Sequence, residues 1–378
     1  MVQHCTSRSD TLGHWDTANL RRRVCHALDI AEKACKQLAA DGYTDPEEPA
    51  NNVLPEKILA ETAFLLVAVS SVTQSRAITA RINQLAQMLA PEARSKRMLL
   101  GMALRPALAL DYAQAHICLA KLGYPDPLFD TLLRQTMESL TGHERPPHRM
   151  LEQEWIARTW NYARPRNSGS TLTAARNSAL ALPMDLLHGT REDIYAFTHA
   201  LMYVRNFNHR PHALPRPQDE ILAEAEGALA RCLDEEDYDL AGEVLLAWPL
   251  TAANWSSMAA FGFRVLARVE DKVGFLPAPN TRLERLQRLA GDQRSRYLLA
   301  TAYHTTYVMG LLCATSLQRG RKPPRNIPLT PCSPGSAAAI MPFLHDANRK
   351  HWQDEFDMLP PVAQDSLAKL LFPQSPLT

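Results

Sequence analysis

The stretch TREDIYAFTHALMYVRNF, residues 190–207, has the pattern of a helix that is buried on more than one side. Its apolar residues recur at intervals of three and four, which is typical of a packed helix. Tyr195, His199 and Tyr203 are spaced by four, so they share one face and form a polar stripe along this apolar segment. A buried imidazole needs hydrogen-bond partners, and the flanking tyrosines could supply them.

The same spacing extends along the whole chain, whereas alternating runs rich in Val, Ile and Thr are missing. Prolines, 27 against 15 glycines, fall between the helical segments and mark their ends. We therefore predict an all-α protein. The predicted helices cover residues 17–40, 55–72, 75–90, 97–122, 126–141, 149–162, 171–182, 190–205, 218–233, 237–249, 253–271, 281–289 and 294–318, followed by one or two closing helices in 336–371.

The architecture follows from the number of helices. Short helices without heptads exclude a coiled coil, and they are too many for one four-helix bundle. A solenoid normally repeats every 33 to about 47 residues, but only EKILAETAFLLVAV and YDLAGEVLLAW are loosely alike. This favours a closed ring of antiparallel helical hairpins, an α/α toroid, with an open α-solenoid as the alternative. We expect an N-terminal helix in 1–45, the toroid core in 46–318, and a Pro-rich strap with closing helices in 319–378.

Composition excludes several classes of protein. Forty-one Lys and Arg against forty Asp and Glu leave a net charge of +1. This charge is too small to attract a polyanion, so we expect no nucleic-acid partner. No apolar run reaches the roughly 18 residues of a membrane span. The seven cysteines form no C-x-x-C pair, and the first residues lack the apolar core of a signal peptide. These features indicate a reducing cytoplasm.

Three polar segments are interpreted as solvated surface. They are the acidic run DEEDYD at 234–239, the basic run Arg21–Arg23, and the loop histidines of NHRPH, which include His212. Of these residues only Asp239, the last of the acidic run, is assigned to a site.

Two further helices carry ionisable residues in apolar surroundings. In DYDLAGEVLLAW, Asp239 and Glu243 lie one turn apart, and Glu243 borders an apolar run. In RYLLATAYHTTYVMGLLCA, His304 is embedded among apolar residues and tyrosines. Buried groups of this kind cost free energy unless they are paired, and the inner ends of toroid helices meet at one cavity. We therefore predict a shared central site, with Tyr195 and Tyr203 orienting one imidazole. The predicted site residues are His199, Glu243, His304, Tyr195, Tyr203 and Asp239.

The chemistry of this set is open between two interpretations. His199, Glu243 and His304 match the two imidazoles and one carboxylate that hold Zn or Fe(II) and leave positions free for substrate. The same residues could act as general acid and base without a metal. Motifs for a P-loop, a dinucleotide fold, an H-E-x-x-H zinc site or a G-x-S-x-G nucleophile are missing.

The series YAFTHALMYVRNF, DLAGEVLLAW and YHTTYVMGLL resembles a family of all-helical bacterial proteins associated with specialised-metabolite gene sets. The matching positions, within residues 50–315, are Thr198 with His199, Asp239 with Glu243, and Tyr303-His304-Thr305. The chain departs from the family at Asn206, where an acidic residue followed by Phe and Gly is expected. A second segment, VLARVEDKVGFLPAPN, resembles the helix ends of terpenoid-cyclase and lanthionine-cyclase toroids. The resemblance implies a helical toroid with tailoring or cyclisation activity.

We therefore expect a biosynthetic tailoring enzyme that acts on a mostly apolar small-molecule or peptide intermediate. Acid-base or metal-assisted cyclisation, elimination or isomerisation would take place in the central cavity. The alternative is a non-catalytic helical scaffold that binds a partner protein or a carrier-tethered intermediate. A scaffold would have an exposed groove and no enclosed polar cavity.

Overall fold

The computed structural model describes residues 15–44, 52–72, 75–138, 145–161, 171–208, 211–318, 320–327 and 350–371. These residues form helices and connecting segments without a β-strand, and an isolated β-bridge joins Tyr43 to Val53, so the all-α prediction is confirmed. The helices are α1 (Thr17–Lys36), α2 (Pro55–Val72), α3 (Arg76–Ala93), α4 (Lys96–Leu104), η2 (Pro106–Leu108), α5 (Ala109–Lys121), α6 (Pro127–Glu138), α7 (Pro147–Thr159), α8 (Thr171–Arg176), α9 (Arg191–Arg205), η3 (Asn206–Asn208), α10 (Gln218–Asp234), α11 (Tyr238–Leu245), α12 (Ala247–Thr251), α13 (Ser257–Val273), α14 (Leu283–Arg288), α15 (Gly291–Ser316), α17 (Lys350–Asp357) and α18 (Pro361–Leu371).

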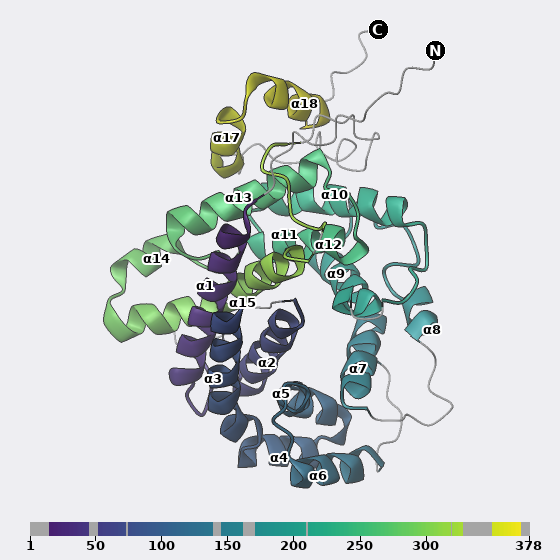
Figure 1. Ribbon diagram of the computed structural model, residues 1–378, viewed down its shortest axis with the longest axis vertical. Coiled ribbons are helices and arrows are strands. Elements are labelled where there is room, and N and C mark those ends of the chain that lie inside the picture. The colour runs from purple at the N-terminus through teal and green to yellow at the C-terminus, as the bar shows by residue number, and fades with distance from the viewer. Residues whose placement is uncertain are drawn as a thin grey trace.

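Six of these helices make a closed cycle of contacts around the middle of the molecule (Figure 1). Helix α2 packs against α5, α5 against α7, α7 against α9, α9 against α11, α11 against α15, and α15 returns to α2. An open stack would leave its first and last members apart. The cycle therefore favours the predicted ring over the solenoid.

The other helices cover the ring from outside. Helix α1 packs along α15 and also touches α3, which lies on α2. Helices α4 and α6 lie against α5, α8 against α7 and α9, and α10 and α13 against α11. Helix α17 packs on α13 (Figure 1). The division of the chain at residues 45 and 318 stays a prediction, and the segment 328–349 lies outside the described residues.

The packing of α1 on α15 shows how the apolar spacing becomes structure. Leu20, Val24, Ala27 and Ala31 recur along one face of α1 and are all fully buried. The two helices approach closely because Gly310 of α15 has no side chain, and a methyl group there would collide with that of Ala27. The close packing of α1 on α15 therefore depends on having small residues, Ala27 and Gly310, where the two helices meet.

Two predicted helices are divided in the structure, and proline explains both divisions. The helix predicted over 97–122 breaks at Pro106, which cannot donate the helical hydrogen bond and pushes Arg105 out of the helical region, to φ −130 and ψ 67. The helix predicted over 237–249 divides at Leu246, because Pro249 likewise lacks the N–H that would continue it.

Two of the segments interpreted as solvated surface are in part buried, so that interpretation is wrong. Arg23 is fully buried and pairs with Glu270 and Asp271 of α13. Asp237, which caps α11, is 4% exposed, and its carboxylate pairs with Arg191 of α9 at 2.7 Å. Both groups tie neighbouring helices together, which a polar run in the sequence does not reveal.

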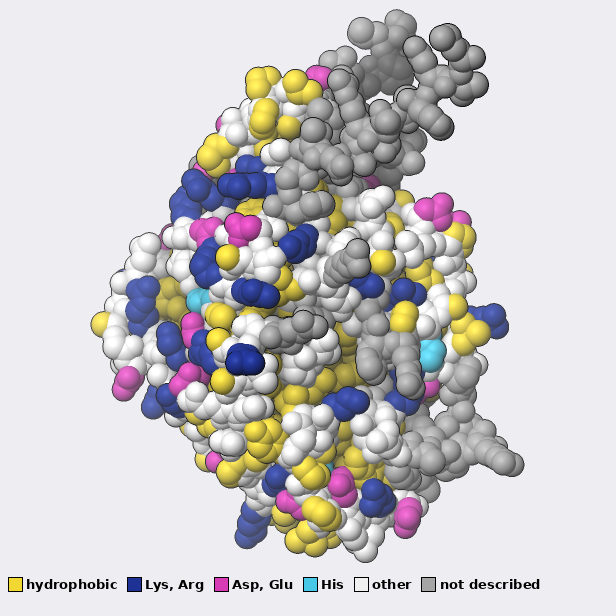
Figure 2. Space-filling view, viewed as in Figure 1, with side chains coloured by type: hydrophobic (Ala, Val, Ile, Leu, Met, Phe, Trp, Pro, Cys, Tyr) yellow, Lys and Arg dark blue, Asp and Glu magenta, His cyan; other side chains and the backbone are white. Residues whose placement is uncertain are grey.

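The surface is mixed in charge. Figure 2 shows Lys and Arg interspersed with Asp and Glu over the visible face, without a large area of one sign. None of the helices in the described residues combines the length and the apolar character that a membrane span requires. Five cysteines of this part of the chain are free thiols.

Candidate functional site

The ring surrounds a central cavity of about 400 Å³ that opens to solvent, and each of the six ring helices contributes side chains to its wall. All the site residues predicted from the sequence line this cavity, namely Tyr195, His199, Tyr203, Asp239, Glu243 and His304. The structure therefore brings the three separate segments together, while the roles of their residues stay predictions.

His199 is held in one orientation through its Nδ1 atom. This nitrogen lies 3.1 Å from the backbone oxygen of Tyr195 and 3.4 Å from Oε2 of Glu243. Since both neighbours are acceptors, Nδ1 must carry the proton. The other nitrogen, Nε2, has no hydrogen-bond partner among the described residues, so in the neutral ring it presents a free lone pair.

Glu243 is fixed as an anion beside this imidazole. It is 4% exposed, and its Oε2 accepts a hydrogen bond of 2.6 Å from the hydroxyl of Thr198. Burial would raise the pKa of the Glu243 carboxyl, but His199 and His304 outweigh it and hold that pKa well below its usual range. A charged Glu243 can both orient His199 and stabilise its protonated form.

His304 faces carboxylates with both of its ring nitrogens. Nδ1 lies 3.0 Å from Glu61, and Nε2 lies 3.6 Å from Asp239 and 3.7 Å from Glu243. Burial alone would lower the pKa of His304, but these carboxylates raise it well above its usual value. His304 is therefore an imidazolium at neutral pH, and its charge holds three acidic groups together.

Glu61, on α2, completes this cluster and was not predicted. Its Oε2 also accepts a hydrogen bond of 2.6 Å from the hydroxyl of Tyr303, and its Oε1 lies 3.7 Å from Nζ of Lys57. Burial opposes ionisation of Glu61, yet the charges of His304 and Lys57 lower its pKa to about 2. A signal for it exists in the sequence, because Glu61 interrupts the apolar run ILAETAFLLVAV in the way that Glu243 interrupts its own.

Asp239 pairs with a second residue that sequence reasoning missed. Arg191, at the start of α9, contacts Asp239 at 3.2 Å and Asp237 at 2.7 Å. Burial raises the pKa of Asp239, and the nearby Glu243 charge adds to that effect while His304 opposes it. Asp239 is therefore the carboxyl group of the cluster that is most easily protonated.

The two tyrosines line the cavity, but the predicted hydrogen bonds from them to His199 are absent among the described residues. The hydroxyl of Tyr203 instead donates to Oε1 of Glu152 at 2.9 Å, and Arg149 holds the other oxygen of Glu152 at 2.6 Å. Tyr195 restrains His199 through its backbone oxygen and by ring contact, with centroids 3.8 Å apart. Burial raises the pKa of the Tyr195 hydroxyl, which therefore keeps its proton.

The arrangement does not support the predicted metal set. In the part of the chain that the structure describes, no group of three or more His, Cys, Asp or Glu side chains is placed to hold a metal ion. Nδ1 of His304 donates to Glu61 and Nε2 lies within ion-pair distance of Asp239 and Glu243, and an imidazolium has no lone pair to give to a metal.

The fold and its cavity define an all-helical protein in which a cluster of acidic and imidazole side chains lines a cavity between six helices. The chain belongs to the family described as a domain of unknown function (DUF6895), whose model matches residues 25–314. This match runs from α1 to α15 and so includes every helix of the ring. No curated protein and no solved structure matches the chain.

Proposed function

We propose that this protein is an enzyme that transfers protons on a mostly apolar small molecule held in the central cavity. His199 would act as the general base, and the reaction would be a cyclisation, elimination or isomerisation that begins with removal of a proton. The biosynthetic role and the cytoplasmic location predicted from the sequence are part of the same proposal.

The observation that carries this proposal is the state of His199. Its Nδ1–H is engaged by two acceptors, and its Nε2 has no partner among the described residues at the wall of the central cavity. A base oriented by a carboxylate and able to reach a ligand with its second nitrogen is the arrangement used for general-base catalysis. Phe64, Met202 and Val308 supply apolar wall for the body of a substrate.

Tyr195 is the best-placed proton donor. Its ring lies against His199, its hydroxyl stays protonated, and that hydroxyl makes no hydrogen bond to another described residue. It can therefore donate to a negative charge that develops on the substrate. His304 would act through Glu243 and Asp239 as a positioning residue, because its own nitrogens are engaged.

An acid-base reaction is proposed in preference to a metal-assisted one because both nitrogens of His304 are committed to carboxylates. The ionisable side chains that converge on one cavity likewise support an enzyme over the scaffold alternative, which needs no such convergence.

The test uses 5-nitrobenzisoxazole, a small aromatic probe for a positioned base. The base takes the proton from C3 while the N–O bond breaks, and the product is a coloured cyanophenolate. We expect the protein to exceed an equal concentration of imidazole by roughly 100-fold or more. His199→Gln should reduce the rate to the imidazole level, and Glu243→Gln should lower it by roughly tenfold.

The matched control is His188→Gln, since the His188 side chain is 84% exposed and remote from the cavity lining. This variant should keep the full rate. Nitrogen NMR of the His199 ring provides a second readout, in which the proton should be on Nδ1. A wild-type rate no greater than that of imidazole, or a proton on Nε2 of the neutral ring, would refute the proposal.

A further inference from the structure

A second cavity, of about 560 Å³, lies beyond the central cavity along the ring helices. The central cavity is lined near the starts of α2 and α7, at Glu56 and Arg149. The second cavity is lined near the ends of the same two helices, at Ser71 and Thr159. Its volume is within the range of about 300–1,000 Å³ typical of small-molecule sites. The two cavities therefore follow one another along the inside of the ring.

The lining of the central cavity changes from polar to apolar in the direction of the second cavity. On α2, Glu61 is followed by Leu65, and the same helix then reaches the second cavity. On α9, His199 is followed by Met202 in the same way. A ligand whose polar end lies against His199 and Glu61 would therefore direct its apolar part toward the second cavity.

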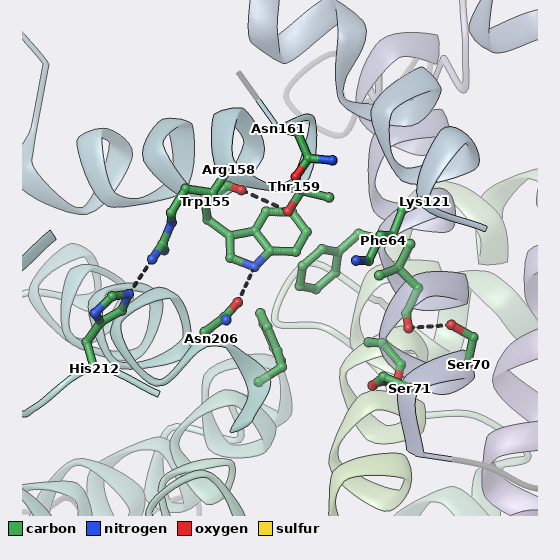
Figure 3. A pocket seen from close by; sticks show the side chains of 13 residues that line it. Phe64, Ser70, Ser71, Lys121, Trp155, Arg158, Thr159, Asn161, Asn206 and His212 are labelled. Atoms are coloured by element: carbon green, nitrogen blue, oxygen red, sulfur yellow. Dashed lines mark hydrogen bonds between the residues drawn. The ribbon is translucent and has the colours of Figure 1, made fainter. Parts of the chain in front are cut away.

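One aromatic side chain, Phe64 of α2, lies between the two cavities, since it lines both of them. Its ring contacts those of Trp155 and Phe207 at centroid distances of 5.2 and 4.8 Å. Trp155 is held in place, because its indole N–H donates to Oδ1 of Asn206 at 2.9 Å (Figure 3). Phe64 has no polar atom that could anchor its ring, and its side chain is partly exposed. Its ring can therefore change rotamer while Trp155 stays fixed.

The second cavity can hold an apolar chain without leaving hydroxyl donors unpaired. Ser70, Ser71 and Thr159 each donate their hydroxyl to a carbonyl oxygen of their own helix. Val67 and Phe207 supply apolar wall beside them. A chain of methylene groups would thus cost these hydroxyls no hydrogen bond.

Backbone strain is concentrated at the second cavity. Five residues other than glycine have positive φ in the part of the chain that the structure describes, and three of them, Asn161, Asn206 and Phe207, line this cavity. Such conformations persist where the surrounding structure holds them, and they cluster at ligand sites. The wall of the second cavity is therefore built to a defined shape.

We propose that the two cavities bind one elongated ligand, with a polar, reactive end at His199 and a linear apolar chain that passes Phe64 into the second cavity. Phe64 determines whether a chain is admitted, and it is thus a specificity-determining residue. The role of the end at His199 rests on the proposed function, whereas the path of the chain rests on the lining of the two cavities.

Titration with 1-decanol and 1-butanol, followed by calorimetry and nitrogen NMR, tests this path. NMR reports on the indole N–H of Trp155 and on the ring of His199, whose signals are assigned with Trp155→Phe and His199→Gln. One equivalent of 1-decanol should shift both signals, because one molecule reaches both cavities. Each buried methylene should raise the association constant roughly fourfold, so 1-decanol should bind more tightly than 1-butanol by roughly 100-fold or more.

Two variants of Phe64 change the passage in opposite directions. Phe64→Trp fills it and should remove the response of Trp155, while the preference for 1-decanol over 1-butanol falls by roughly tenfold or more. Phe64→Ala leaves the passage open and should keep both the response and the preference. The control is Phe356→Ala on α17, outside both linings, which should behave as the wild type.

The proposal is overturned if 1-decanol shifts only one of the two signals or binds as two equivalents. It is also overturned if Phe64→Trp keeps the wild-type preference or if Phe64→Ala loses it. Binding is measured without turnover. A protein that binds 1-decanol as described but fails the elimination assay would therefore refute the proposed function alone.

Discussion

Replacing His304 with Gln removes the one cation that three carboxylates of the central cavity, Glu61, Asp239 and Glu243, share. The magnitude follows from Glu61, whose pKa falls from 4.5 to about 2 largely because His304 is beside it. That difference corresponds to about 3 kcal/mol of folding stability at neutral pH. The loss of a partner from a buried ion pair costs about 3–5 kcal/mol. Since the His304 side chain is 31% exposed, we expect a loss of about 3 kcal/mol, at the lower end of that range.

The effect should depend on pH in a defined direction. The contribution of Glu61, whose pKa is lowered, is complete above pH 4.5 and is lost as the pH falls toward 2. The contribution of His304, whose pKa is raised, is complete below pH 6.5 and is lost as the pH rises toward the folded-state value. The difference between wild type and His304→Gln should therefore be largest between these two values.

Urea unfolding followed by circular dichroism, repeated across a pH series, measures this difference. His188→Gln is the matched control, because the His188 side chain is 84% exposed and its pair with Asp185 is on the surface. It should change the free energy of unfolding by less than about 0.5 kcal/mol. A loss below about 1 kcal/mol for His304→Gln, or a loss that does not vary with pH, would contradict the ionic cluster.

Two further predictions concern the packing around the ring, and both are measured by urea unfolding. Gly310→Ala places a methyl group against Ala27 across the contact of α1 with α15 and should cost about 1–3 kcal/mol; an unchanged stability would show that the helices do not meet there. Arg23→Ala leaves Glu270 buried without its cation and should cost about 3–5 kcal/mol, whereas Arg22→Ala, at a side chain 56% exposed, should cost less than about 0.5 kcal/mol. Equal losses for the two arginine variants would show that Arg23 is not the buried partner.

The helices were largely predictable because their signals are local. Apolar spacing located the ring helices, and proline marked most of their ends. The breaks at Pro106 and Leu246 were missed because the apolar pattern continues across them. The start of α9 carries a capping box, in which Asp193 accepts from the backbone N–H of Thr190 at 2.6 Å.

Residues of the central site could be predicted where an ionisable side chain interrupts the apolar pattern of its own helix. His199, Glu243 and His304 did so, and the structure brings them together. Glu61 carried the same signal but was considered only as part of a weak repeat. The sequence also does not reveal hydrogen-bond partners. The hydroxyl of Tyr203 was expected to bond to His199, but it donates to Glu152.

The packing of α1 on α15 affects the order in which the protein can acquire its structure during synthesis. The buried face of α1 is made early, but the helix that covers it ends only at Ser316. Contacts between such distant segments form slowly, because a long loop must first be closed. Until α15 leaves the ribosome, the apolar faces of α1 and α2 lack their main partner, which makes the nascent chain a natural client for chaperones.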